Sequence, residues 1–432
     1  MTEADVTIDQ DGQGGILGRV RSEFGFIRGN LLLILVGWLL TDFTREMAFT
    51  YYPLYVQALG GTASTVGLLG AASQITSALM QFPGGYIADK YGRKRIIYSM
   101  TILAAFAYLF FMFAPNWQTI LLGVILSEIC FMYTPAFNAL VMDSIPSEKR
   151  GTGYSIINLV TSASTTPSPM LAGLLYLNFG LVTGTRISFG FVVVAFLISG
   201  LLRTRLKETL ENPEPISGRE VLRSFTGART FIDGIKAWDE VPKAVLALLL
   251  IQLMFIIPNT MFNVTFIFYV TEVLGFTPME LAYVGTAISV SVIALAIPCG
   301  KLVDKIGKKK PILIASVLIA IAMPFMITGT FVKVMIIAPV IALVNILFGT
   351  AIQALNADLI PQEHRGKILG SRSFFLLIAS SVGSIMGGYI YDNVSRVLPM
   401  YILWAVNVPF FVLTYLFVKE SQKENPVETL NV

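Results

Sequence analysis

The chain has 432 residues, of which 55% are hydrophobic and only 13% are charged, and its mean hydropathy is +0.71. Soluble proteins carry roughly a quarter charged residues, so this composition excludes a set of large water-facing domains and with them most soluble enzymes. The formal net charge of +4 gives no sign of a nucleic-acid partner. Two isolated cysteines, Cys130 and Cys299, lie in apolar stretches and predict neither a disulfide framework nor a metal site.

Apolar runs of membrane-spanning length follow one another along most of the chain. Acidic residues precede the first run, which argues against a signal peptide. At roughly 20 residues per crossing, we expect an all-α membrane protein. The twelve expected transmembrane helices are residues 31–58, 66–88, 96–114, 119–142, 152–178, 183–202, 244–272, 280–303, 311–329, 334–357, 368–390 and 397–418.

These runs divide the chain into two bundles of six helices with polar segments around them. We expect an N-terminal arm (1–30), a first bundle (31–202), a linker (203–243), a second bundle (244–418) and a tail (419–432). The linker mixes basic and apolar residues, so it is either a solvated loop or a segment that lies on membrane lipids.

The distribution of Lys and Arg predicts the orientation. Basic clusters such as 93–95, 149–150 and 308–310 follow even-numbered crossings, whereas loops 60–65 and 115–118 contain no basic residue. By the positive-inside rule, both termini of this multi-pass protein lie on the cytoplasmic side of the plasma membrane.

An internal repeat explains the length. Shifting the sequence against itself by 215 residues aligns a series of Gly, Pro, Asp and Arg residues without a gap. The aligned pairs include Gly60 with Gly275, Pro83 with Pro298, Asp89 with Asp304, Asp143 with Asp358, Arg150 with Arg365 and Gly173 with Gly388. Two bundles in the same orientation enclose a central cleft, which is the expected substrate site of an alternating-access carrier, although the repeat alone also allows a channel.

Two motifs are duplicated in the same register. After the second crossing the chain reads Gly85-Tyr-Ile-Ala-Asp89-Lys90-Tyr-Gly92-Arg93-Lys94, and after the eighth it reads Gly300-Lys-Leu-Val-Asp304-Lys305-Ile-Gly307-Lys308-Lys309. Asp143-Ser-Ile-Pro146-Ser-Glu148-Lys-Arg150-Gly151 likewise matches Asp358-Leu-Ile-Pro361-Gln-Glu363-His364-Arg365-Gly366. We expect Gly85 and Gly300 to let a neighbouring helix approach, and Gly92 and Gly307 to permit a tight turn.

These motifs make residues 31–418 resemble the major facilitator superfamily, and the resemblance implies that superfamily's twelve-helix fold. It also implies a gate that closes the cytoplasmic side through charge pairs. In the first half the gate would comprise Gly85, Asp89, Gly92, Arg93, Asp143 and Arg150, and in the second half Gly300, Asp304, Gly307, Lys308, Asp358 and Arg365. Two motifs common in efflux members are absent: position 123 is Gly instead of Arg, and the fifth crossing offers only Ser168-Pro169-Met-Leu-Ala-Gly173.

Charged residues within the crossings are candidates for ion coupling. Asp42, Arg45 and Glu46 lie in the first crossing, where each would cost roughly 2.5 to 3.5 kcal/mol at the bilayer centre unless it faced the cleft. Their i, i+3 and i+4 spacing predicts two acids that share one base, so one carboxyl can titrate while the other stays ionised. Glu128 adds a further buried acid in the fourth crossing. A structural ion network is the alternative for these residues, and sodium is the alternative to the proton.

Aromatic and amide side chains near the cleft predict an amphipathic organic substrate. The candidate lining residues are Phe49, Tyr52, Asn259, Phe262 and Asn263. Interfacial anchoring by aromatics and interhelical bridging by Asn are the competing interpretations.

We therefore predict a monomeric secondary transporter that exports small amphipathic compounds in exchange for protons and needs no cofactor. Import by proton symport is the close alternative. A primary pump is disfavoured because the chain has no phosphate-cradling G-x-x-x-x-G-K-[ST] loop, and an intramembrane enzyme or a lipid scramblase because no reactive constellation is present. The residues do not specify the substrate.

Overall fold

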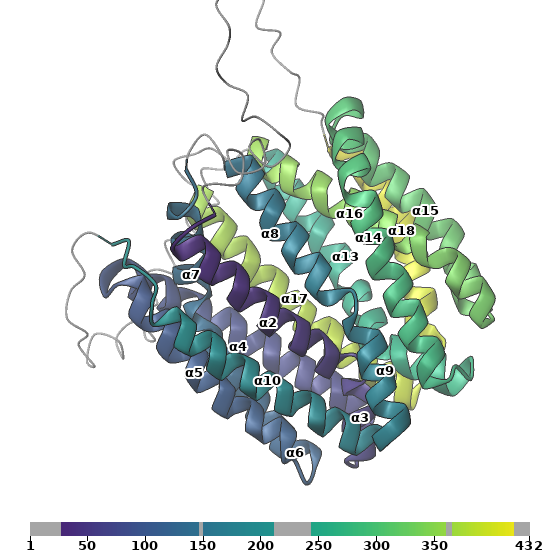
Figure 1. Ribbon diagram of the computed structural model, residues 1–432. Helices are drawn as coiled ribbons and strands as arrows, with labels where there is room; N and C mark the ends of the chain where they lie inside the picture. Colours follow the sequence, from purple (N-terminus) through teal and green to yellow (C-terminus); the bar gives the residue numbers. More distant parts are fainter. Residues whose placement is uncertain (1–26, 147–149, 211–242, 360–364, 419–432) are drawn as a thin grey trace, which may run out of the picture.

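The computed structural model describes residues 27–146, 150–210, 243–359 and 365–418. The predicted arm and tail, and all but the ends of the predicted linker, lie outside the described residues. Helices account for nearly all of the described chain (Figure 1).

The first half contains six helical crossings, three of which are interrupted. They are α2 (Asn30–Phe49) with α3 (Tyr52–Ala58), α4 (Ala63–Lys90), α5 (Arg93–Met112), α6 (Trp117–Cys130) with η1 (Phe131–Tyr133) and α7 (Thr134–Asp143), α8 (Arg150–Thr165) with α9 (Ser168–Phe179), and α10 (Leu181–Arg203). Proline follows each break, at Pro53, Pro135 and Pro169, because its missing N–H is tolerated only in the first turn of a helix.

The second half repeats this order. It contains α13 (Lys243–Phe268) with the π-turn η3 (Tyr269–Val273), α14 (Pro278–Ile306), α15 (Lys309–Ile327), α16 (Phe331–Leu359), α17 (Arg365–Asn393) and α18 (Leu398–Phe417). Each helix lies within a few residues of a predicted crossing, so the prediction of an all-α membrane protein with twelve transmembrane helices is confirmed.

By length and apolar composition alone, nine of these helical segments in the described chain could cross a membrane. The remaining crossings are α2–α3, which carries the three charged residues of the first crossing, α4, and α8–α9.

The internal repeat is visible in local structure. Thr62 closes a capping box at the start of α4, and Thr277, which lies 215 residues later, closes one at the start of α14. Gly92 and Gly307 both have a left-handed backbone, with φ of 91° and 90°, so the tight turns expected after α4 and α14 are present.

The two halves pack through pairs of long helices. Helix α17 runs along α4, and α14 packs against α9. In Figure 1 the light-green α17 lies among the purple and blue helices of the first half. Glycines allow this contact: a Cβ at Gly67 would lie 2.3 Å from the carbonyl oxygen of Ser384, and one at Gly388 would lie 2.4 Å from that of Ala63.

Candidate functional site

Helix α2 carries the three charged residues of the first crossing. Asp42 and Arg45 are half-buried, whereas Glu46 is exposed. Among the described residues, no ion pair joins Arg45 to Asp42, Glu46 or Glu128. The sharing of one base by the two acids of this helix therefore stays a prediction. The Arg45 guanidinium lies over the ring of Phe131, with 5.0 Å between its central carbon and the ring centroid.

A cavity of about 220 Å³ adjoins this guanidinium, and we call it the charged cavity. Its lining includes Arg45, Phe49, Tyr52, Ser73, Tyr108 and Glu128. Tyr108 and Phe111, which both line it, are almost completely buried and contact Phe189. Arg45 Nε and Tyr52 Oη are buried without a hydrogen-bond partner in the described structure. The predicted coupling residues Arg45 and Glu128 therefore lie beside the predicted lining residues Phe49 and Tyr52.

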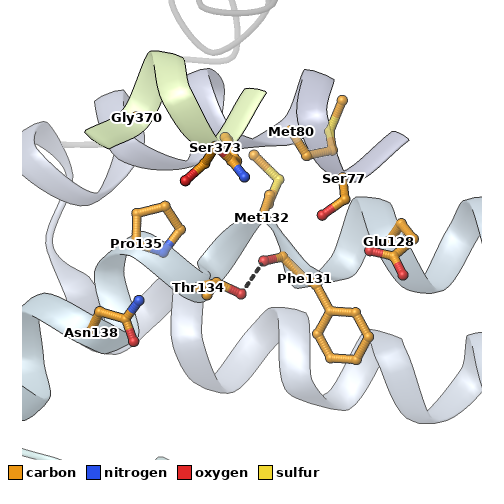
Figure 2. Close-up of a pocket in the computed structure, with 11 residues that line it drawn as sticks. Ser77, Met80, Glu128, Phe131, Met132, Thr134, Pro135, Asn138, Gly370 and Ser373 are labelled. Atoms are coloured by element: carbon orange, nitrogen blue, oxygen red, sulfur yellow. Dashed lines mark hydrogen bonds between the residues drawn. The ribbon is translucent and has the colours of Figure 1, made fainter. Parts of the chain in front are cut away.

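Glu128 stands between this cavity and a second one. Its carboxylate accepts a hydrogen bond from the Ser73 hydroxyl at 2.7 Å. The second cavity, which we call the inner cavity, has a volume of about 390 Å³ and shares Glu128 and Phe131 with the first. Figure 2 shows Glu128 and Ser77 at one end of the inner cavity and Asn138 at the other. Gly370, in the first turns of α17, also lines this cavity.

The remaining predicted lining residues belong to the second half. Asn259, Phe262 and Asn263 line a separate cavity of about 150 Å³ beside Met323 and Asn345, which we call the amide cavity. The amide of Asn263 donates to the Asn259 carbonyl at 2.8 Å and to its side-chain oxygen at 3.0 Å. The predicted lining residues thus divide between two cavities, one in each half.

The described part of the predicted gate contains one ion pair. Arg93 pairs with Asp143, and its guanidinium also donates to the Thr209 hydroxyl at 3.0 Å. The side chains of Asp89, Arg150, Asp304, Asp358 and Arg365 lie outside the described structure, so their part of the network stays a prediction. Lys308 has interactions of its own.

Glycine packing near the gate differs from the expectation. No described atom lies within 4 Å of the Cβ position at Gly85 or Gly300. The close approach occurs at Gly84, where a Cβ would lie 2.1 Å from the carbonyl oxygen of Met132. The physical reason is the 3-10 turn η1, which brings the Met132 backbone against α4 one residue earlier than the motif suggested.

Glu208, which follows α10, caps the start of α5 from a distant part of the chain. Its carboxylate accepts the backbone N–H of Arg93 at 3.1 Å and that of Lys94 at 2.9 Å. Partial burial raises the pKa of Glu208, but these and other backbone hydrogen bonds outweigh burial and hold the pKa below its ordinary value. The cap positions the first residue of the gate motif's basic cluster.

Two arginines with partners inside the bundle, the buried Arg203 and the half-buried Arg372, were not predicted. Arg203, at the end of α10, is 1% exposed and donates to the hydroxyls of Thr101 at 2.5 Å and Tyr133 at 3.1 Å. Its guanidinium lies 4.6 Å from the ring centroid of Phe137. Arg372 of α17 donates to the side-chain oxygen of Gln252. In the sequence, Arg203 is the first residue of the expected basic linker. The one sign that it is buried is the hydrophobic run of the sixth crossing, which continues to Leu202 directly before it.

Polar contacts also join the two halves at one end of the bundle, and we call this group the clasp. Glu272 accepts from the Gln57 amide at 2.8 Å and from the Tyr391 hydroxyl at 3.2 Å, and it pairs with Arg396 at 3.4 Å. The clasp has two further contacts: Asp392 accepts the Ser64 backbone N–H at 2.7 Å, and the Tyr51 hydroxyl donates to the Pro278 carbonyl at 2.5 Å. None of these contacts was predicted, because each depends on which helix ends meet.

Comparison with known proteins identifies the family. The model of the Major Facilitator Superfamily matches residues 34–258 and 248–430. The chain belongs to the major facilitator superfamily. It is similar to the multidrug resistance protein MdtG of Citrobacter koseri, with 26% identity over 374 residues that cover 84% of this chain and 88% of that protein. MdtG of Salmonella typhi is 26% identical over 381 residues and covers the same shares.

Solved structures support the same fold. A bacterial homologue of the human lysosomal transporter Spinster superposes with a TM-score of 0.68 at 15% identity, covering 90% of this chain and 96% of that one. The human organic anion transporter MFSD10 gives a TM-score of 0.64 at 14% identity, covering 89% and 98%. The chain is thus a multi-pass secondary transporter of the plasma membrane that moves a small molecule, and it is not an enzyme.

Proposed function

We propose that this chain exports small amphipathic organic molecules in exchange for protons. The observation that carries the proposal is the position of Glu128, which forms part of the wall between two cavities and is held there by Ser73. A carboxyl group that can be reached from two compartments of the cleft can release its proton into one and receive the substrate from the other. Buried acids of this kind mark proton relays in transporters.

The acids of α2 support the same role. Asp42 and Glu46 lie within a turn of Arg45, and neither forms an ion pair with it. They are thus available to exchange protons or, in the alternative that the sequence left open, sodium. Sodium dependence of transport at constant pH is the outcome that would favour the alternative.

Alternating access would depend on two sets of contacts at opposite ends of the bundle. The clasp holds the two halves together at the end that we assign to the outside, through Glu272 and Asp392. The pair Arg93–Asp143 lies at the other end, where we place the gate that closes when the clasp opens. With the clasp formed, the inner cavity is the route by which a cytoplasmic compound would reach Glu128. We expect a monomer with both termini cytoplasmic to perform this cycle.

The lining favours an amphipathic substrate. Phe49 and Tyr52 offer aromatic faces in one half, and Asn259 and Asn263 offer amides in the other. The MdtG relatives are named multidrug resistance proteins, which accords with a substrate of this class.

Everted membrane vesicles test the direction and the ion together. Vesicles with an acidified lumen should lose protons when an exported compound is added, so a panel of amphipathic compounds is screened with a pH-sensitive dye. Glu128→Gln vesicles and vesicles without the protein are the controls. Absence of proton release for every compound, or equal release with Glu128→Gln, refutes the proposal, and proton movement in the opposite sense identifies a symporter.

A further inference from the structure

The charged cavity separates a guanidinium from a carboxyl group. Arg45 and Glu128 both line a space of about 220 Å³, yet no ion pair forms between them. Burying an ionisable group away from an opposite charge is costly, and direct pairing of the two side chains would be the simplest way to reduce that cost. The cavity between the two groups therefore calls for something that carries both complementary charges.

On the arginine side of the cavity, one guanidinium nitrogen lacks an acceptor although the Tyr108 hydroxyl lies nearby. Arg45 Nε and Tyr52 Oη are buried and have no hydrogen-bond partner in the described chain. The two serine hydroxyls that line the cavity are already used as donors, Ser73 to Glu128 at 2.7 Å and Ser127 to the Val124 carbonyl at 2.9 Å. A buried donor normally finds an acceptor, and a planar guanidinium suits a carboxylate or another oxyanion.

The glutamate side lacks a cation. The groups that face Glu128 are the hydroxyls of Ser73 and Ser77 from α4, Tyr108 from α5 and Arg45 from α2. None of the described groups is a cation in contact with its carboxylate. A substrate ammonium could take the place of a proton there. The ammonium would bind the carboxylate as the carboxyl proton leaves to water, so binding and proton release would be one exchange.

We propose that the charged cavity is a zwitterion site, in which an anionic group of the substrate binds Arg45 and Tyr52 and a cationic group binds Glu128. The apolar part of the substrate would lie against Phe49, Phe131 or the wall of the inner cavity. The proposal rests on the proposed function and deepens it, because it names the substrate class and explains why substrate and proton would exclude one another.

Three probes that share one amino-acid side chain, which we call the frame, test ligand binding to the site at equilibrium. L-Phenylalanine carries both charges, L-phenylalaninamide only the positive one, and N-acetyl-L-phenylalanine only the negative one. Binding to the purified full chain is measured by calorimetry at pH 7 without a gradient, and the trio is repeated on leucine and tryptophan frames. Because a hydrogen bond to a charged group contributes about 1.5 to 3 kcal/mol, the zwitterion should bind about ten- to 150-fold more tightly than either relative on at least one frame.

The variants should separate the two ends of the site. Arg45→Gln should abolish the advantage of the zwitterion over the amide and keep its advantage over the N-acetyl compound, and Glu128→Gln should do the reverse. Arg186→Gln is the matched control, since Arg186 binds the Ala114 carbonyl at 2.7 Å and does not line the cavity. In weak buffer, zwitterion binding should release protons from the wild type and not from Glu128→Gln.

Three outcomes would refute the zwitterion site. They are equal binding of all three probes for every amino acid tested, no binding of any probe, or loss of both preferences in either single variant. The wild-type comparison needs no mutation, and Arg45→Lys keeps the charge if Arg45→Gln does not fold. A zwitterion preference without proton flux in vesicles would refute the coupling and leave the site standing, whereas flux without the preference would refute the site alone.

Discussion

Replacing Gly67 by alanine should open the end of the bundle that the clasp closes. In the present state a Cβ at this position would lie 2.3 Å from the carbonyl oxygen of Ser384 on α17, a distance that requires backbone movement. Overpacking of this kind costs about 1 to 3 kcal/mol. The higher helix propensity of alanine stabilises α4 equally in both states, so it cancels from the equilibrium between them. The population with the clasp closed should therefore fall about five- to 150-fold relative to the open population.

A distance measurement between the two halves detects this shift. Spin labels are attached at Ala58→Cys on α3 and Val394→Cys after α17, both exposed, in a chain whose native cysteines Cys130 and Cys299 are replaced by alanine. Pulsed dipolar spectroscopy should show one short distance in the parent and a longer population in Gly67→Ala.

The control is a glycine that has free space around it. Gly349→Ala adds the same methyl group to α16, where no described atom lies within 4 Å of the new Cβ, so the distance distribution should not change. If Gly67→Ala leaves the distribution identical to that of the parent, the α4–α17 contact does not separate in the transport cycle, and the assignment of this end as a gate is refuted.

Four further outcomes follow from the remaining sites. Glu46→Gln or Asp42→Asn should abolish proton-driven uphill transport and leave substrate counterflow measurable; unchanged uphill transport in both contradicts a coupling role. Asp89→Asn should slow turnover with little change in binding affinity, because the gate motif lies outside the cleft, and a large loss of affinity with normal turnover argues against a gate. Arg203→Ala should lower stability by about 3 to 5 kcal/mol, since it removes two hydrogen bonds and an aromatic contact from a buried site, which a thermal-unfolding series can measure. Glu208, whose folded-state pKa is lowered, should stabilise the fold above its unfolded-state pKa and lose this effect as the pH falls through the folded value, so Glu208→Gln should unfold with a smaller acid dependence.

The fold can be predicted from the sequence because the bilayer imposes it. The crossings follow from runs of about 20 apolar residues, and the register of 215 residues accounts for the paired capping boxes at Thr62 and Thr277. Turns at Gly92 and Gly307 are predictable because a left-handed backbone favours glycine. These features are local, so neighbouring residues suffice to specify them.

The site was only partly predictable because its geometry depends on contacts between helices. The spacing of Asp42, Arg45 and Glu46 correctly places them on adjacent turns, but it cannot say that Phe131, from the broken fourth crossing, lies beneath the guanidinium. The clasp depends in the same way on which helix ends meet: Asp392 contacts the start of α4, a partner 328 residues away.

The two halves share a scaffold and differ in charge. Tyr55 donates to the Phe111 carbonyl at the end of α5 at 2.8 Å, and Tyr269 donates to the Ile327 carbonyl at the end of α15 at 2.5 Å, so the same contact braces both bundles. The charges within the crossings of the first half have no such counterpart, unlike those of the gate motifs. Shifted by 215 residues, Arg45 aligns with Thr260, Glu128 with Leu343 and Arg203 with Val418.

This asymmetry has a consequence for transport. If coupling and substrate charges are all bound by the first half, they keep their protein partners as the second half rocks past them. The amide cavity of the second half, with Asn259, Asn263 and Asn345, then offers a neutral wall that hydrogen-bonds in either state. The halves can therefore separate without breaking an ion pair in the middle of the membrane, where such a break would cost most. The described contacts between the halves that involve a charged group, Gln57 with Glu272 and Ser64 with Asp392, instead lie at the end of the bundle, in the clasp, where water can solvate the separated groups.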